Sequence, residues 1–306
     1  MKNNLNDMPV YAPTTSNEPM EAIGHRIQTF ASSRPNHPAL VSEQGTMSWR
    51  TLLDRTNQIA NRLRDAGLQT GDAVAALSEN SADYVALYLG VLTAGGCMVP
   101  LSGMASPEAL NLMLSDCNAE FLFVSQKNHE LLHSFWPELK GLSADRIIAL
   151  DEVGEGIGRP LNDWLGNASS EGAPAEVTMD DAFNIIYSSG TTGTPKGILH
   201  DYRFRQRQMV RMSRFGLDGE AINLVSTPLY SNTTLVSVLP TLFHGGTLVI
   251  MAKFDARRFL ELAEKHRVTH AMLVPVQYQR ILADPEFDRF DLSSFKLKLC
   301  TSAPLR

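Results

Sequence analysis

The stretch that decides the fold is GDAVAALSENSADYVALYLGVLTAGGCMVPL, residues 71–101. Two short apolar runs, AVAAL (73–77) and CMVPL (97–101), stand on either side of a helical pattern that Ser81 opens and Gly95-Gly96 closes. Short apolar strands joined by a helix are typical of a βαβ unit, whose parallel strands are buried on both faces. This stretch therefore predicts a mostly parallel sheet covered by helices.

The same alternation continues on both sides of this unit. Further strands are predicted at 121–124, 147–150, 183–189, 222–226, 247–251, 270–278 and 296–302, with helices between them near 49–66, 107–116, 200–214, 233–243 and 255–265. We expect an α/β fold of stacked, mostly parallel sheets. The segment 151–178 is rich in Gly, Pro and acidic residues and is predicted to be a long surface loop at a subdomain boundary. The prediction divides the chain into a flexible tail (1–17), a first α/β subdomain (18–178) and a second (179–306).

Composition excludes several classes of protein. The chain has 306 residues, of which 43% are apolar and 20% charged, and this balance excludes a coiled coil, collagen and a wholly disordered chain. With 27 Lys and Arg against 33 Asp and Glu, no bulk attraction to nucleic acid or to an anionic membrane is expected. Three cysteines without a C-x-x-C pair indicate a reducing compartment. No membrane span or secretory signal is visible, so we expect a cytoplasmic protein.

The most informative motif is YSSGTTGTPKG, residues 187–197, which directly follows an apolar strand. Its glycines let backbone N–H groups turn towards one point, its hydroxyl residues add donors, and Lys196 adds a positive charge. Concentrated donors of this kind favour a polyphosphate ligand. The pattern G-x-x-x-x-G-K-[ST] does not fit, because Pro195 stands five residues after Gly190. The alternative is a solvent-exposed hairpin or linker that is rich in turn-forming residues.

At these residues the chain resembles the adenylate-forming superfamily of acyl- and aryl-CoA synthetases, luciferases and peptide-synthetase adenylation domains. Residues 187–197 are similar to the phosphate loop of that family almost letter for letter. TPLYSN (227–232) resembles its next motif, and TSAPL (301–305) resembles the turn that packs against adenine. A weaker likeness, which includes residues 48–74, extends over the chain from about residue 20.

The resemblance implies a two-step reaction. A carboxylate attacks the α-phosphorus of ATP to give an acyl adenylate and pyrophosphate, and a thiol, usually that of coenzyme A, then takes the acyl group. Prepositioned donors and Mg²⁺ would meet the charge that grows on the leaving pyrophosphate. The expected substrate is a fatty or aromatic carboxylic acid, and homo-oligomerisation is left open.

The resemblance also assigns roles to individual residues. Thr191 and Lys196 are the expected catalytic residues, and Thr191 is also the expected magnesium ligand. The expected nucleotide-binding residues are Ser188, Ser189, Gly190, Thr191, Thr192, Gly193, Thr194, Lys196, Ser302, Ala303 and Pro304. The expected acyl-site residues are Tyr230, Ser231, Val276, Gln277 and Tyr278. Core packing is an equal alternative for the apolar residues near 270–278.

Two departures from the family pattern limit the assignment. Where many coenzyme A ligases carry histidine after the aromatic residue of the second motif, this chain has Ser231, so the gating role passes to Tyr230 alone. The family's acidic magnesium ligand, ribose-binding aspartate and mobile C-terminal lid domain with its catalytic lysine would lie beyond Arg306. We therefore expect the front part of such an enzyme, with an incomplete core and exposed apolar edges. The alternative is a non-catalytic nucleotide-binding remnant.

Two weaker patterns also carry hypotheses. His129-Glu130-Leu131-Leu132-His133 matches H-E-x-x-H, the helical motif of zinc proteases. An amphipathic surface helix is the favoured interpretation, because a short motif of this kind recurs by composition alone. Arg207, Arg211 and Arg214 share one helix face, and this spacing fits either a patch for coenzyme A phosphates or, the favoured interpretation, a solvated face.

Overall fold

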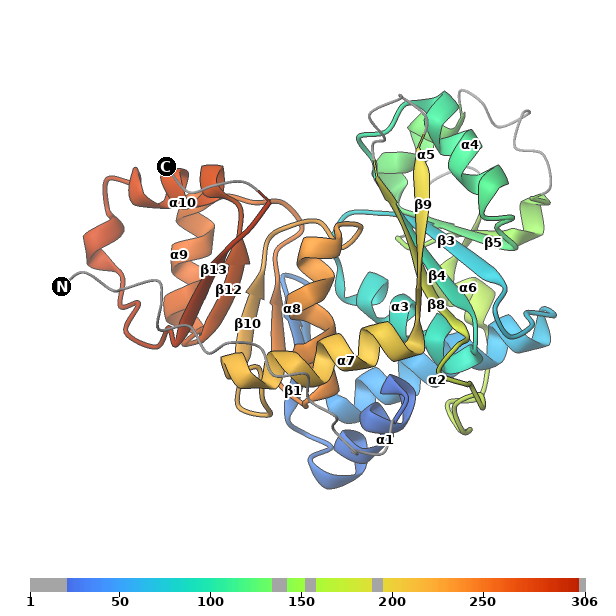
Figure 1. Ribbon diagram of the computed structural model, residues 1–306, viewed down its shortest axis with the longest axis horizontal. Helices are drawn as coiled ribbons and strands as arrows, with labels where there is room; N and C mark the ends of the chain where they lie inside the picture. The colour runs from blue at the N-terminus through green and yellow to red at the C-terminus, as the bar shows by residue number, and fades with distance from the viewer. Residues whose placement is uncertain (1–20, 134–141, 152–157, 189–194, 303–306) are drawn as a thin grey trace.

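The computed structural model describes residues 21–133, 142–151, 158–188 and 195–302. These residues form two β-sheets with helices between and around them (Figure 1). The predicted tail, residues 1–17, lies outside the described ranges. An α/β fold with stacked, mostly parallel sheets is confirmed.

The seven-stranded sheet holds the βαβ unit that the sequence predicts. Its strands, in spatial order, are β7 (Arg159–Pro160), β6 (Ile147–Ala149), β5 (Phe121–Val124), β3 (Ala73–Leu77), β4 (Cys97–Leu101), β8 (Ala182–Ser188) and β9 (Lys196–Asp201). Its neighbouring strands pair in parallel, except that β8 and β9 form an antiparallel hairpin.

The six-stranded sheet combines strands from both ends of the described chain. Its strands, in spatial order, are β13 (Leu297–Cys300), β12 (His270–Leu273), β10 (Ile222–Val225), β11 (Thr247–Ile250), β1 (Pro38–Ser42) and β2 (Gly45–Ser48). Only β1 and β2 are antiparallel among the pairs that the structure describes in this sheet. Each sheet therefore takes strands from both sides of residue 178.

Helices cover both faces of each sheet. Their bounds are α1 (Ile23–Ser33), α2 (Trp49–Asp65), α3 (Ala82–Ala94), α4 (Pro107–Asp116), α5 (Gln126–His133), α6 (Leu161–Leu165), α7 (Tyr202–Met212), α8 (Asn232–Phe243), α9 (Ala256–Lys265) and α10 (Pro275–Leu282). Residues of α1, α2, α3 and α8 share one apolar core with both sheets. The far face of the seven-stranded sheet packs on α4 and α5, and the far face of the six-stranded sheet packs on α9 and α10.

Local sequence signals explain where these helices begin and end. Ser48, Ser81 and Ser106 each cap a helix, because their side chains accept hydrogen bonds from backbone N–H groups three residues later. Gly95 ends α3 in the left-handed conformation, with φ of 91°. Nearly every residue of α3 is buried, as expected for a helix that lies between two sheets.

Several elements differ from the sequence-based prediction. The predicted strand 270–278 is wrong in its second half: the strand ends at Leu273 and α10 begins at Pro275, because proline suits the first turn of a helix. The predicted loop 151–178 contains β7 and α6, and Trp164 of α6 is buried against Phe121 and Phe123. The sequence analysis also missed β1, β2 and β9.

The strand orders place a topological switch point in each sheet. In the seven-stranded sheet, β3 lies between β4 and β5. The chain passes from β3 to β4 on one side and then crosses back to β5 on the other side of β3. In the six-stranded sheet, β10 lies between β11 and β12 in the same way. Ligands of open α/β sheets bind at the carboxyl ends of the strands beside such a switch point. Two edges of the molecule are therefore candidate binding regions.

The contact between α2 and α3 gives a test of the packing. A Cβ on Gly90 would lie 2.6 Å from Ile59 Cγ2, 2.8 Å from Ile59 Cβ and 3.2 Å from the Thr56 carbonyl oxygen. Alanine favours helix by about 1 kcal/mol over glycine, whereas overpacking costs about 1–3 kcal/mol. We therefore expect Gly90→Ala to destabilise the chain by up to about 2 kcal/mol in urea unfolding.

A double-mutant cycle with Ile59→Ala serves as the control. Because Ile59→Ala removes the clashing Cγ2 methyl group but keeps Cβ, the cost of Gly90→Ala should become smaller in that background. A net stabilisation by Gly90→Ala alone would contradict the close α2–α3 packing.

Candidate functional site

The switch point of the six-stranded sheet carries paired polar side chains. Ser226 follows β10 and Gln277 lies in the first turn of α10, after β12, and both are buried. Gln277 Nε2 donates to Ser226 Oγ at 3.4 Å, and Gln277 Oε1 accepts from the Val274 N–H at 3.2 Å. The structure thus brings Gln277, a predicted acyl-site residue, to the carboxyl edge of β10 and β12.

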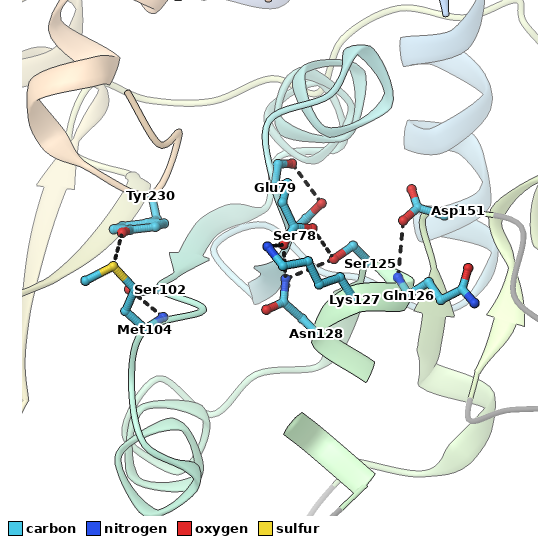
Figure 2. Close-up of polar contacts among 10 residues, drawn as sticks. All are labelled: Ser78, Glu79, Ser102, Met104, Ser125, Gln126, Lys127, Asn128, Asp151 and Tyr230. Atoms are coloured by element: carbon cyan, nitrogen blue, oxygen red, sulfur yellow. Dashed lines mark hydrogen bonds and ion pairs between the residues drawn. The ribbon is translucent and has the colours of Figure 1, made fainter. Parts of the chain in front are cut away.

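Tyr230 and Ser231 lie at the same edge, in the turn between β10 and α8. Ser231 occupies the N-cap position of α8, and its N–H donates to the Pro228 carbonyl at 3.0 Å. The half-buried Tyr230 ring directs its hydroxyl to Met104 Sδ at 3.7 Å (Figure 2). Met104 follows β4 of the other sheet and is 87% exposed, so this is a surface contact between the carboxyl edges of the two sheets.

Ser302 adds a third strand end to this edge. It follows β13 with φ of 70°, and its hydroxyl lies 3.0 Å from the hydroxyl of Thr233 in the first turn of α8. Ala303 and Pro304, predicted beside it, lie outside the described residues. The end of β13 therefore meets the first turn of α8, directly after the TPLYSN motif, although the two residues are 69 positions apart in sequence.

Val276 and Tyr278 lie away from the Ser226–Gln277 pair. Val276 is exposed on α10. Tyr278 donates to the Leu299 carbonyl at 2.9 Å, and burial, with a smaller effect of Cys300, raises its pKa to about 12. Tyr278 lines an apolar cavity of about 430 Å³ on the face that α9 and α10 cover, together with Phe259, Leu273, Ile281, Phe295 and Cys300. Their acyl-site roles stay predictions.

The two ends of the predicted phosphate loop lie at the carboxyl end of β8. Ser188 ends β8 and pairs with Lys196, which begins β9, and both are exposed. The loop thus connects the strands of an antiparallel hairpin, and its residues Ser189, Gly190, Thr191, Thr192, Gly193 and Thr194 lie outside the described part of the chain. Tyr187 anchors the hairpin by donating to Asp116 Oδ2 at 2.5 Å. Because β8 neighbours β4, this loop end is on the edge that carries Met104.

The three arginines of α7 lie at the opposite edge of the sheet. Asp201, which caps α7, pairs with Ala182 at the beginning of β8. Arg207, Arg211 and Arg214 are exposed along and just beyond this helix. Their place at the amino edge favours the solvated-face interpretation over a phosphate patch beside the loop.

A second polar cluster lies at the switch point of the seven-stranded sheet. Glu79, after β3, accepts from Lys127 Nζ at 2.8 Å, Ser125 Oγ at 2.7 Å and Asn128 Nδ2 at 3.3 Å, all from the end of β5 and the beginning of α5 (Figure 2). Partial burial acts to raise the pKa of Glu79, but the hydrogen bonds from Lys127 and Ser125 outweigh it and hold the pKa below its usual value.

This cluster predicts a pH-dependent contribution to stability. Because the pKa of Glu79 is lowered by folding, its ionised form stabilises the fold above the unfolded-state pKa of about 4.3, and this contribution is lost as pH falls through the lower, folded value. Urea unfolding at several pH values should show Glu79→Gln less stable than the parent at neutral pH by about 1 kcal/mol or less, since solvent screens the pair. The difference should shrink below about pH 4. A difference that does not change with pH would contradict the assignment.

The described residues show neither a cluster of metal-ligating side chains nor a membrane-spanning helix. Within them, no group of three or more His, Cys, Asp or Glu side chains is placed to hold a metal ion. The H-E-x-x-H motif lies on α5, but the side chains of Glu130 and His133 are outside the description, as is Thr191, the predicted magnesium ligand. Leu132 is buried, as the amphipathic interpretation expects. In the described part of the chain, no helix has the length and hydropathy that a bilayer crossing requires.

Sequence reasoning missed three residues of this edge: Met104, Ser226 and Thr233. Each contacts a predicted site residue, but its partner lies on another strand or helix and no local pattern identifies the pair. The available signal was the position directly after an apolar strand, where parallel sheets bind ligands. That rule selects Ser226 and, less directly, Met104.

Residues 27–306 match the AMP-binding enzyme family, and the chain belongs to it. The resemblance to the adenylate-forming superfamily is thereby confirmed. Feruloyl-CoA synthase of an Amycolatopsis species is 32% identical over 272 residues, which are 88% of this chain and 52% of that protein. The chain spans about half the length of this curated relative.

Two solved structures share the fold. One is the anthranilate CoA ligase AuaEII in complex with anthranoyl-AMP, with a TM-score of 0.86 and 24% identity over 94% of this chain and 56% of that one. The other is ATP-bound MatB from Rhodopseudomonas palustris, with a TM-score of 0.79 and 26% identity over 93% of this chain and 55% of that one. The arrangement of sheets and helices in this chain is therefore shared with both structures.

Proposed function

We propose that this chain supplies the nucleotide and carboxylate sites of an acid–thiol ligase. The carboxylate would attack the α-phosphorus of ATP, so that a carbon-bound oxygen forms a bond to phosphorus as the bond to pyrophosphate breaks. The thiol of coenzyme A would then attack the carbonyl carbon of the acyl adenylate and release AMP. A carrier-protein thiol is the alternative acceptor.

One observation carries this proposal: the carboxyl edges of both sheets face each other where the motifs lie. Tyr230 of the six-stranded sheet contacts Met104 of the seven-stranded sheet, next to the strand pair that holds Ser188 and Lys196. A nucleotide whose phosphates lie at residues 188–196 would thus have its reacting end near Tyr230. This arrangement supports a reaction between ATP and a second substrate.

The residues at this edge suit the charges of the reaction. Lys196 is exposed at the end of the hairpin and can approach a phosphate without first breaking an ion pair that the structure describes. Ser188 offers a hydroxyl on the paired strand. Lysine donates charge-assisted hydrogen bonds to phosphate, and fixed donors need little reorganisation as charge develops.

The substrate class is a fatty or aromatic carboxylic acid. The similarity to feruloyl-CoA synthase supports an aromatic acid. In this chain the Tyr230 hydroxyl contacts the Met104 thioether, and Ser231 is the next residue in sequence. An aromatic ring beside a thioether and hydroxyl groups can pack on a flat aryl acid and still offer it hydrogen bonds.

The first test measures ATP binding by the chain. Lys196→Ala should weaken binding of Mg-ATP about tenfold, equivalent to ~1.4 kcal/mol, because one charge-assisted phosphate contact is lost. Isothermal titration calorimetry gives the affinity directly. Arg207→Ala, which removes an exposed cation at the opposite edge, is the matched control and should leave the affinity unchanged. Equal effects of the two substitutions would contradict the proposed phosphate site.

The second test measures chemistry. Carboxylate-dependent exchange of labelled pyrophosphate into ATP should appear with ferulate, benzoate or octanoate, and the double substitution Thr191→Ala and Thr192→Ala should lower both this exchange and ATP binding. Binding of ATP without exchange for any carboxylate would instead favour the non-catalytic remnant. Unchanged ATP affinity after the double substitution would contradict the proposal that the predicted phosphate loop binds ATP.

A further inference from the structure

Asn80 is the one side chain after β3 that reaches into the other sheet among the hydrogen bonds that the structure describes. Its Nδ2 donates to the Thr227 carbonyl at 2.9 Å and to the Met251 carbonyl at 3.2 Å, and its Oδ1 accepts from the Leu229 N–H at 2.8 Å. Only 4% of the residue is exposed. A single amide therefore binds the ends of β10 and β11 to the end of β3.

These three bonds fix the turn that carries Tyr230. Thr227 and Leu229 stand on either side of Pro228, and Tyr230 is the next residue. The same turn is tied to α8, because Thr234 Oγ1 donates to Thr227 Oγ1 at 2.8 Å. A turn held from both sides has few alternative conformations, so the direction of the Tyr230 side chain is set by its neighbours in sequence.

Asparagine suits this position because the turn needs both donors and an acceptor. The asparagine amide supplies two N–H donors and one carbonyl acceptor on the same planar group. Alanine would leave the Thr227 and Met251 carbonyls and the Leu229 N–H without this partner in a buried place, and serine is too short to reach all three. Buried polar groups without partners favour a movement of the backbone towards water. In Asn80→Ala the segment that would move is the turn at 227–230, which loses two of its hydrogen bonds.

We propose that Asn80 is a positioning residue that holds Tyr230 against Met104 at the acyl end of the site. The expected effect on carboxylate binding rests on the proposed function. The expected effect on the position of the Tyr230 side chain does not. The phosphate loop is carried by β8 and β9 and shares none of these three hydrogen bonds. Loss of Asn80 should therefore impair carboxylate recognition more than ATP binding.

The test uses the chain labelled with 3-fluorotyrosine and followed by ¹⁹F NMR. The chain has seven tyrosines, and the Tyr230 resonance is assigned as the one that disappears in Tyr230→Phe. In Asn80→Ala the Tyr230 resonance should move towards the position of free 3-fluorotyrosine, with a larger solvent isotope shift. Asn80→Ser should show a smaller displacement in the same direction, and it provides the readout if Asn80→Ala does not fold.

Asn57→Ala is the matched control. Asn57 is equally buried, and its Nδ2 donates to the Ser170 carbonyl at 2.8 Å, so it also joins distant segments. Its loss should lower the melting temperature and leave the Tyr230 resonance in place. If Asn80→Ala and Asn80→Ser leave that resonance unmoved, or if Asn57→Ala moves it equally, the positioning role is wrong.

Ligand titrations separate this inference from the proposed function. Asn80→Ser should weaken binding of ferulate in the presence of ATP and leave the ATP affinity within the error of the parent. A displaced Tyr230 resonance in a chain that binds neither ATP nor ferulate would contradict the proposed function and uphold the positioning role. An unmoved Tyr230 resonance in a chain that binds ATP and ferulate would uphold the proposed function and contradict the positioning role.

Discussion

Parallel pairing of short buried strands is the constraint on which the rest of this structure depends. Because all the described strands except β2 and β9 run parallel to their neighbours, their carboxyl ends meet at one edge of each sheet, and residues far apart in sequence become neighbours there. β3 and β10 are each flanked by the next two strands of the chain, one on either side. This is a topological switch point, and ligands of open α/β sheets bind at the carboxyl edge beside it. Asn80 then holds these two edges together through three buried hydrogen bonds.

The division of labour between the two sheets follows from this arrangement. The seven-stranded sheet carries the phosphate-loop hairpin and the Glu79 cluster, and the six-stranded sheet carries Tyr230, Gln277 and Ser302. We therefore expect the phosphates at the seven-stranded sheet, and the carboxylate, together with the predicted adenine turn at Ser302, at the six-stranded sheet. Membership of the AMP-binding enzyme family agrees with a site of this kind.

The sequence predicts the buried part of this fold well, because buried parallel strands are apolar throughout and their helices have clear caps. AVAAL and CMVPL form β3 and β4 with the predicted bounds. The edge strands β2 and β9 escape prediction because solvent covers much of them, which removes the apolar run. The apolar run 270–278 predicts one strand, although Pro275 within it is the first residue of α10. Asn80 could not be predicted, because Thr227 and Met251, its partners just after β10 and β11, are 147 and 171 positions away.

Hydrogen–deuterium exchange with and without Mg-ATP tests the central claim most directly, namely that the carboxyl edges of both sheets form one nucleotide and acyl site. Amide exchange reports local opening segment by segment, including segments for which no side-chain contact is described. The account predicts ATP-dependent protection in 187–197, 226–234 and 300–302, with no change along α7 at the opposite edge. Protection confined to α7, or absent from both carboxyl edges while ATP binds, would contradict it.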